Sequence, residues 1–156
     1  MCVVWLKNSV VEAIMAETYR WSPKETGGVL IGYVVGKEEI VITGLVGPGP
    51  SAKHTVGSFS PDNEYQTREI GRHYMESGRI NVYLGDWHSH PNAPSYLSPR
   101  DIMTFKKIAL FKPARMRQPL MLVLGTDPVM LNIWRFTPGG ILSPDSIKPC
   151  RLNYWS

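Results

Sequence analysis

The apolar residues of this chain occur mainly in short runs that are bounded by glycine, proline and polar residues. Such runs are typical of β-strands, and a strand that is covered on both faces is apolar at nearly every position. The segments predicted as strands are 3–6, 28–35, 39–45, 59–60, 80–87, 120–124 and 129–136. The polar stretch Gly36-Lys37-Glu38 between the second and third of these segments indicates a hairpin turn.

Three other segments are predicted as helices: 9–21, 60–77 and 98–111. In the first of them, Val10, Ala13 and Ile14 recur at helical spacing. The other two begin at Ser-Pro pairs, which suit a helix start because proline lacks an amide hydrogen that the first turn would leave unbonded. The second helix is expected to have Pro61 at its first position and Gly78 as its stop. This order of elements predicts an α/β domain with a mixed central sheet flanked by helices.

The length of 156 residues indicates one domain over 1–156, and its Pro- and Ser-rich end, 138–156, is expected to lie over the core as an irregular tail. Hydrophobic residues make up 43% of the chain and charged residues 19%, a balance that excludes intrinsic disorder. The only cysteines are Cys2 and Cys150. A disulfide-dense scaffold and a cysteine-based zinc finger are therefore also excluded.

Composition says less about location and partners. No apolar segment reaches the ~20 residues that a membrane span requires, and the first residues do not resemble a signal peptide, so the expected compartment is the cytoplasm. A basic cluster is either a solvated helix face or a docking patch for an acidic protein or nucleic acid. Its members are Lys106, Lys107, Lys112, Arg115 and Arg117. No aromatic interleaving of the single-strand-binding type accompanies it, so nucleic acid is not an expected partner.

The clearest chemical pattern begins with His88 and His90, which are two residues apart at the end of a predicted strand. Residues i and i+2 of a strand face the same side, so the two imidazoles can converge on one point. Ser98 and Asp101 follow in the first turn of the next helix, and a loop that brought this turn to the strand end would add a carboxylate. Two histidines, one carboxylate and an open fourth position form a catalytic zinc arrangement.

Each of these features also has a purely structural explanation. The two histidines can form a polar strand end without a metal. The run Ser98-Pro-Arg-Asp101 is a good helix start by itself, with Ser98 as the cap and Asp101 reaching back to it. The coincidence of both features across one short Pro-rich loop favours the metal site.

The spacing also matches a known signature. His88-Ser-His90-Pro, the loop 91–97 and Ser98-Pro-Arg-Asp101 together resemble the His-x-His-(seven)-Ser-x-x-Asp signature of the JAMM metalloproteases, also called the MPN+ or JAB family. The match has no gap and no substituted position. It implies the JAMM/MPN α/β fold, which is similar to the fold of cytidine deaminases.

A second motif of that family precedes the first. Glu25, followed by a Gly-rich strand, resembles the family's upstream motif, so that the resemblance covers about 9–134. It implies that Glu25 is the general acid/base and that Ser98 supports the tetrahedral intermediate. It also implies one zinc ion per chain. The implied zinc ligands are His88, His90 and Asp101.

The resemblance implies zinc-dependent hydrolysis of an amide, typically an isopeptide bond after the C-terminal glycine of a ubiquitin-like protein. The short form looks like prokaryotic members that accompany E1- and E2-like enzymes in antiphage systems. The implied partners are therefore a ubiquitin-like protein or its conjugate, together with those enzymes. Two alternatives are processing of a small sulfur-carrier protein with a Gly-Gly tail and a non-catalytic interaction module of the same fold.

Four further expectations concern residues around the motifs. His54 and His73 are predicted to be surface or hydrogen-bonded histidines without a chemical role, and Trp87 is predicted to lie beneath the site. The loop 91–97 is predicted to line a narrow groove for an extended, glycine-containing substrate tail. Alternatively, this loop only carries the chain to Asp101.

Overall fold

The computed structural model describes residues 1–156. Its helices are α1 (Asn8–Trp21), α2 (Asn63–Glu76) and α3 (Pro99–Leu110), with a short 3-10 helix over Lys112–Ala114. Its strands are β1 (Val3–Lys7), β2 (Gly27–Val35), β3 (Glu39–Val46), β4 (Lys53–His54), β5 (Phe59–Ser60), β6 (Val82–His90), β7 (Leu120–Thr126), β8 (Val129–Thr137), β9 (Ser146–Pro149) and β10 (Arg151–Trp155). None of the helices combines the length and the apolar character that crossing a membrane would require.

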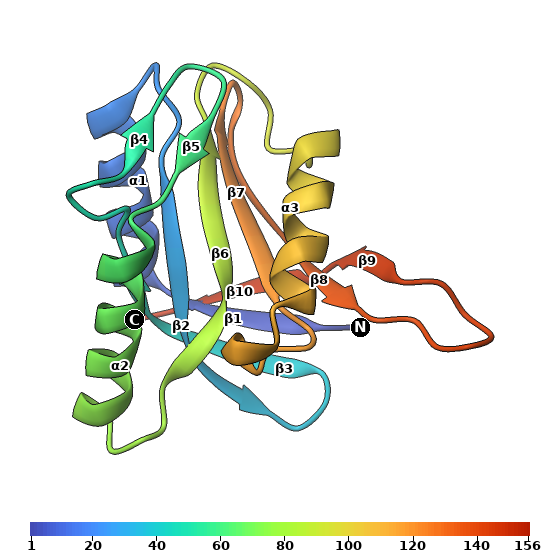
Figure 1. The fold of residues 1–156 in the computed structure, drawn as a ribbon. Coiled ribbons are helices and arrows are strands. Elements are labelled where there is room, and N and C mark those ends of the chain that lie inside the picture. Colours follow the sequence, from blue (N-terminus) through green and yellow to red (C-terminus); the bar gives the residue numbers. More distant parts are fainter.

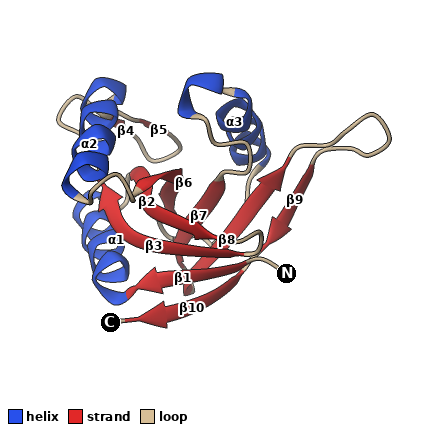
Figure 2. Cartoon of the chain, turned by 90° about the horizontal axis from the view of Figure 1, so that it is seen from below, coloured by secondary structure: helices blue, strands red, loops and turns tan.

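Eight strands form one mixed sheet in the order β10-β1-β3-β2-β6-β7-β8-β9. β1 pairs in parallel with both β3 and β10, β6 pairs in parallel with β7, and the other neighbours are antiparallel. β4 and β5 form a separate two-stranded ribbon. Figure 2 shows how strongly the large sheet curls. The mixed α/β fold predicted from the order of elements is confirmed.

Helices cover both faces of this sheet (Figure 1). Neighbouring residues of a strand project to opposite faces, and β7 shows the division. Leu122 joins Val10 and Ile14 of α1 in the larger hydrophobic cluster, whereas Val123 joins Phe105 of α3 in a second cluster. A third cluster joins β2 and β3 to α2. α1 therefore lies on one face, and α2 and α3 lie on the other.

All the predicted strands and helices form, some with shifted ends. β6 extends beyond the predicted 80–87 to His90, so both histidines of the motif lie within the strand. The two-residue strand β4 was not predicted. It pairs with β5 through Lys53–Ser60 and His54–Phe59, and it is too short to leave an apolar pattern.

α2 begins later than predicted. Asp62 is its N-cap, with a side chain that accepts a 3.1 Å hydrogen bond from the Tyr65 N–H. Ser60 lies in β5 instead, where it is the register partner of Lys53. The placement of Pro61 at the first helical position was therefore wrong, because Pro61 precedes the cap.

The segment 138–156 is not the irregular tail that the sequence predicted, because it contains β9 and β10. β10 lies in register with β1 from Val3–Arg151 to Lys7–Trp155. The prediction failed because the pairing partner lies at the other end of the chain, and a short edge strand carries little apolar pattern of its own. The first and last strands of the chain thus lie side by side.

Candidate metal centre

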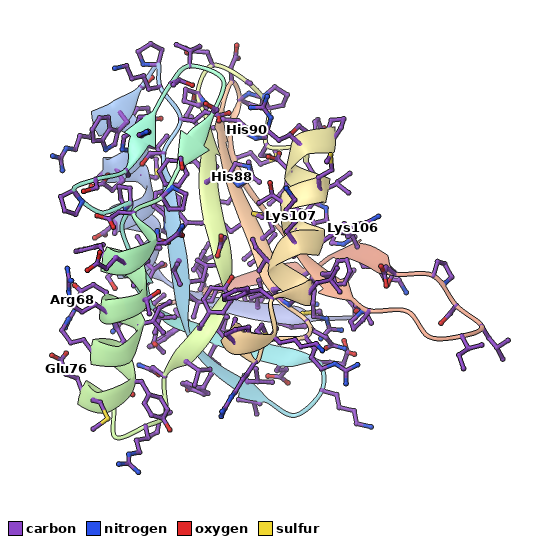
Figure 3. The ribbon with its side chains drawn as sticks, in the orientation of Figure 1. Arg68, Glu76, His88, His90, Lys106 and Lys107 are labelled. Carbon is purple, nitrogen blue, oxygen red and sulfur yellow. The ribbon has the colours of Figure 1, made fainter.

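The two histidines of the motif lie at the end of β6, which is held between β2 and β7. His88 is in register with Val123 of β7, and His90 is in register with Gly125. Both project from the face that carries α3, and Figure 3 shows them between the β4–β5 ribbon and the start of that helix. Trp87 projects to the opposite face, where it is buried (1% exposed), as predicted.

The start of α3 brings a carboxylate to the histidines. Ser98 caps this helix: its Oγ accepts a hydrogen bond from the Asp101 N–H at 3.1 Å, and Asp101 Oδ2 accepts one from the Ser98 N–H at 2.8 Å. The same carboxylate has Oδ1 at 3.1 Å from His88 Nε2 and Oδ2 at 3.1 Å from His90 Nε2. Ser98 and Asp101 can therefore cap the helix and contribute to a metal site at the same time.

Hydrogen bonding around His90 determines which of its nitrogens faces the cluster. His90 Nδ1 lies 3.2 Å from the carbonyl oxygen of Pro94, which can only accept, so Nδ1 carries a hydrogen. In neutral His90 the lone pair is then on Nε2, which faces a carboxylate oxygen of Asp101 and lies 3.1 Å from His88 Nε2. Facing lone pairs repel unless a proton or a metal ion lies between them.

The pKa values of Asp101 and His90 are shifted by their mutual contact. Burial alone would raise the pKa of Asp101, but its contacts with His88 and His90 outweigh burial and hold this pKa well below its usual range. Burial would lower the pKa of His90, yet the Asp101 carboxylate raises it. The carboxylate is therefore ionised at neutral pH, as a metal ligand must be.

The spacing of the three side chains fits a small tetrahedral metal ion. Tetrahedral zinc sites with bonds of about 2.0–2.1 Å have neighbouring ligand atoms about 3.4 Å apart, close to the 3.1 Å contacts here. Nitrogen and carboxylate donors also suit zinc. With only three protein donors, the fourth position would be open to water or substrate.

Glu25 lies in the loop between α1 and β2, just before the strand that pairs with β6. Its main chain is bonded on both sides: its N–H donates to Thr55 O at 2.8 Å, and its C=O accepts from His54 Nδ1 at 2.9 Å. Burial raises the pKa of Glu25, and the nearby His88 and His90 oppose that rise. The carboxylate thus lies within electrostatic reach of the cluster.

The glycines that follow Glu25 allow close approach of the strands. A Cβ atom on Gly27 would lie 2.5 Å from the carbonyl oxygen of Trp87 and 2.8 Å from the ring of Phe59. A Cβ atom on Gly28 would lie 1.9 Å from the carbonyl oxygen of Val46. A side chain on Gly27 would push β2, and Glu25 with it, away from β6, and one on Gly28 would push β2 away from β3.

One cavity of about 420 Å³ joins these groups. Glu25, His90, Ser98 and Asp101 line it together, so the structure brings the predicted residues to one place. Ser98 Oγ uses a lone pair to cap α3, which leaves its hydroxyl hydrogen free to donate into the cavity. The remaining walls come from the tip of the β4–β5 ribbon, from the loop after β6 and from the first turn of α3, through Val56, Gly57, Pro91, Ala93, Pro99 and Arg100.

Sequence reasoning missed two residues around the cavity. His54 does form a hydrogen bond, as predicted, but its partner is the backbone of Glu25. Arg100 lines the cavity and donates from Nη1 to the carbonyl oxygen of Gly57 at 2.9 Å, which ties α3 to the β4–β5 ribbon. The position of Arg100 inside the Ser-x-x-Asp motif was the one feature of the sequence that could have indicated its place beside the cavity. His73 lies on α2 and lines no part of the cavity.

The basic cluster after the motif lies at the surface. All five of its cations are exposed, and none forms an ion pair. Its members are Lys106, Lys107, Lys112, Arg115 and Arg117.

Comparison with known proteins identifies relatives of this arrangement. Residues 7–137 match the family model described as prokaryotic homologues of the JAB domain. A protein of Sinorhizobium fredii named probable metalloprotease y4qB is 42% identical over 130 residues, which cover 81% of this chain and 77% of that protein. A protein of Enterobacter hormaechei named CD-NTase/cGAS isopeptidase is 25% identical over 152 residues, which cover 95% of this chain and 79% of that protein.

A solved structure is similar over almost the whole chain. The solution structure of protein DSY2949 from Desulfitobacterium hafniense superposes with a TM-score of 0.71 at 19% sequence identity, covering 97% of this chain and 92% of that one. At this low sequence identity, the similarity shows that the two proteins share a fold.

Proposed function

The chain belongs to the family of prokaryotic JAB-domain proteins and is a hydrolase of the metalloprotease type, and from this premise we propose that it is a zinc-dependent isopeptidase. Its substrate is a protein linked through the C-terminal glycine of a ubiquitin-like modifier, or the precursor of such a modifier. The observation that carries the proposal is the convergence of His88, His90 and Asp101 at 3.1 Å beside the cavity that Glu25 and Ser98 also line.

His88, His90 and Asp101 would hold the zinc ion through the two Nε2 atoms and the carboxylate. Zinc bound there would polarise the scissile carbonyl and lower the pKa of a water molecule to about 7. Two of these side chains are also held by hydrogen bonds to the main chain. The Pro94 carbonyl fixes the orientation and tautomer of His90, and the Ser98 N–H fixes the Asp101 carboxylate.

Glu25 is proposed to move the proton. Peptide hydrolysis requires a group that accepts a proton from water and then returns it to the leaving amine, and one carboxylate can do both. Glu25 lines the cavity without belonging to the converging cluster. Its pKa, raised by burial, favours this exchange because a more basic carboxylate accepts a proton more readily.

Ser98 is proposed to bind the carbonyl oxygen of the substrate as negative charge develops on it. The hydroxyl hydrogen that capping leaves free can donate to this oxygen. Because the capping box fixes the main chain of Ser98, little reorganisation is needed when the charge develops.

The shape of the entrance supports a narrow, extended substrate tail. The cavity is lined by Val56 and Gly57 of the ribbon tip and by Pro91 and Ala93 of the loop after β6. The loop is tied down, because the Ala93 carbonyl accepts from the Thr126 N–H at 3.1 Å. A rigid wall of this kind would exclude a bulky side chain next to the scissile bond.

The cellular setting is a further part of the proposal. We propose that this chain acts beside E1- and E2-like enzymes in an antiphage conjugation system of the cytoplasm, and the similarity to the protein named CD-NTase/cGAS isopeptidase supports the isopeptidase activity. No observation favours the alternative of sulfur-carrier processing, but that alternative predicts a different substrate.

The test uses fusion and conjugate substrates with native C-termini. The purified protein, loaded with one equivalent of zinc, is incubated with ubiquitin-like proteins and with Gly-Gly-tailed sulfur carriers, each joined to a reporter, and the products are identified by intact mass. Cleavage after the terminal glycine of the ubiquitin-like fusions, lost in Glu25→Gln, is the expected result. Cleavage of the sulfur-carrier fusions alone would favour the alternative, and cleavage of neither would contradict the proposal.

A further inference from the structure

His54 packs against two aromatic rings. Its imidazole stacks on Trp21 with ring centroids 3.5 Å apart and planes 7° apart, and the tilted ring of Phe59, its partner across the ribbon, lies at 5.3 Å. These contacts hold Nδ1 at 2.9 Å from the carbonyl oxygen of Glu25. A carbonyl oxygen only accepts, so Nδ1 donates the hydrogen.

The residue after His54 bonds the other side of Glu25. The Glu25 N–H donates to the carbonyl oxygen of Thr55 at 2.8 Å, and the Thr55 N–H donates to Ser58 O at 2.9 Å, which closes the ribbon turn. The residue after Glu25, Thr26, is bonded to β6, because its C=O accepts from the Ser89 N–H at 2.9 Å and its N–H donates to Ser89 Oγ at 3.0 Å. The hydrogen bonds of the Glu25 backbone itself go to residues 54 and 55.

The same ribbon is attached to the helix that carries Asp101. Arg100 Nη1 donates to the carbonyl oxygen of Gly57 at 2.9 Å, and Arg100 directly precedes Asp101 in the first turn of α3. A continuous set of contacts thus joins His54, the ribbon turn and the converging cluster. It sets the separation between the Glu25 carboxylate and that cluster.

We propose that His54 is a positioning residue, which holds Glu25 at the distance from the metal centre that proton transfer requires. The inference rests on the proposed function of this site and goes beyond it, because the wall residues named above do not include His54. His54 acts through the backbone of Glu25 and does not touch the reacting atoms. A displacement of about 1 Å in such a group can cost about 10²-fold in rate.

Two substitutions separate the hydrogen bond from the aromatic packing. His54→Phe keeps a flat ring against Trp21 and Phe59 but cannot donate, whereas His54→Asn places an N–H donor near the position of Nδ1 but gives up most of the stacking. We expect His54→Phe to lower kcat by about 10²-fold with KM and zinc content unchanged, and His54→Asn to recover most of that loss. The matched control, His73→Phe on α2, should leave kcat unchanged.

A second measurement does not depend on substrate or metal. Hydrogen exchange at the Glu25 amide, followed by NMR in zinc-free protein, reports directly on the bond to Thr55. We expect at least tenfold faster exchange in His54→Phe than in the wild type, and near-wild-type exchange in His54→Asn. Unchanged exchange in His54→Phe would overturn the inference, as would a wild-type kcat in that variant. If the wild type cleaves no substrate, the proposed function fails, and the exchange measurement still decides whether His54 positions Glu25.

Discussion

Asp101 Oδ2 accepts a hydrogen bond from the Ser98 N–H at 2.8 Å while it lies 3.1 Å from His90 Nε2. One carboxylate oxygen thus helps to cap the start of α3 and also faces an imidazole. The two tasks can be separated by substitution, because a helix cap needs only an acceptor, whereas a metal ligand of this kind needs the negative charge.

Asp101→Asn should keep the cap and lose the metal, because the amide oxygen can still accept from the Ser98 N–H but carries no charge. Asp101→Ala should lose both, and we expect it to be less stable than Asp101→Asn by about 1 kcal/mol. Zinc content by elemental analysis and urea unfolding of the zinc-free variants measure the two effects. Equal stability of the two variants would show that the cap contributes nothing.

His88→Ala should abolish stoichiometric zinc binding, because only two of the three converging donors would remain. Wild-type protein should bind one zinc ion per chain. The fold should persist, since a largely apolar core surrounds β6 and does not depend on the site. Circular dichroism checks the fold and elemental analysis checks the metal. Full zinc occupancy in the variant would remove His88 from the ligand set.

Glu25→Gln should keep zinc and lower turnover by at least ~10²-fold, because the amide has nearly the same shape but cannot accept the proton. Single-turnover cleavage of a fusion substrate measures the loss. Glu64→Gln, in the first turn of α2 and away from the cavity, is the matched control and should retain full activity. A fully active Glu25→Gln variant would mean that another group carries the proton.

The pH dependence of kcat/KM should follow the ionisation of Glu25. Burial raises the pKa of this carboxyl, and the base is active only when ionised, so activity should fall as the pH drops through this raised pKa. The acid limb should therefore lie above the pH of about 4.3 that is ordinary for a glutamate. Residual activity of Glu25→Gln should lack this limb. An identical limb in both proteins would assign it to another group.

Substrate specificity should be strictest at the residue before the cut. In a series with glycine, alanine or leucine at that position, we expect rates to fall steeply from glycine to leucine, because the walls of the entrance are rigid. Discontinuous cleavage assays with mass detection give the ratios. Equal rates for glycine and leucine would contradict the narrow-groove model and weaken the isopeptidase proposal with it.

The sequence alone was sufficient to predict most strands and helices, and to predict that the candidate site residues lie together. Apolar runs such as 120–124 were read correctly because a buried strand must be apolar whatever its neighbours are. The spacing of His88, His90 and Asp101 placed these residues together because strand and helix geometry are local. Both inferences depend on properties of short segments.

The features that escaped prediction depend on distant parts of the chain. β10 exists because β1 offers it an edge, and nothing near Arg151 or Leu152 records that edge. The contacts of His54 with Trp21 and Glu25 also escaped prediction, because both partners are about thirty positions away in sequence. Neither contact follows from local periodicity.

The pairing of β1 with β10 also bears on how the protein folds. These strands join residues that are almost the whole chain apart, Val3 with Arg151, and a parallel pair of this kind must close a very long loop before it gains any hydrogen bonds. β1 can pair with β3 much earlier, since only α1 and β2 lie between them in the chain. The outer edge of the sheet should therefore form last, after the half that carries the metal ligands.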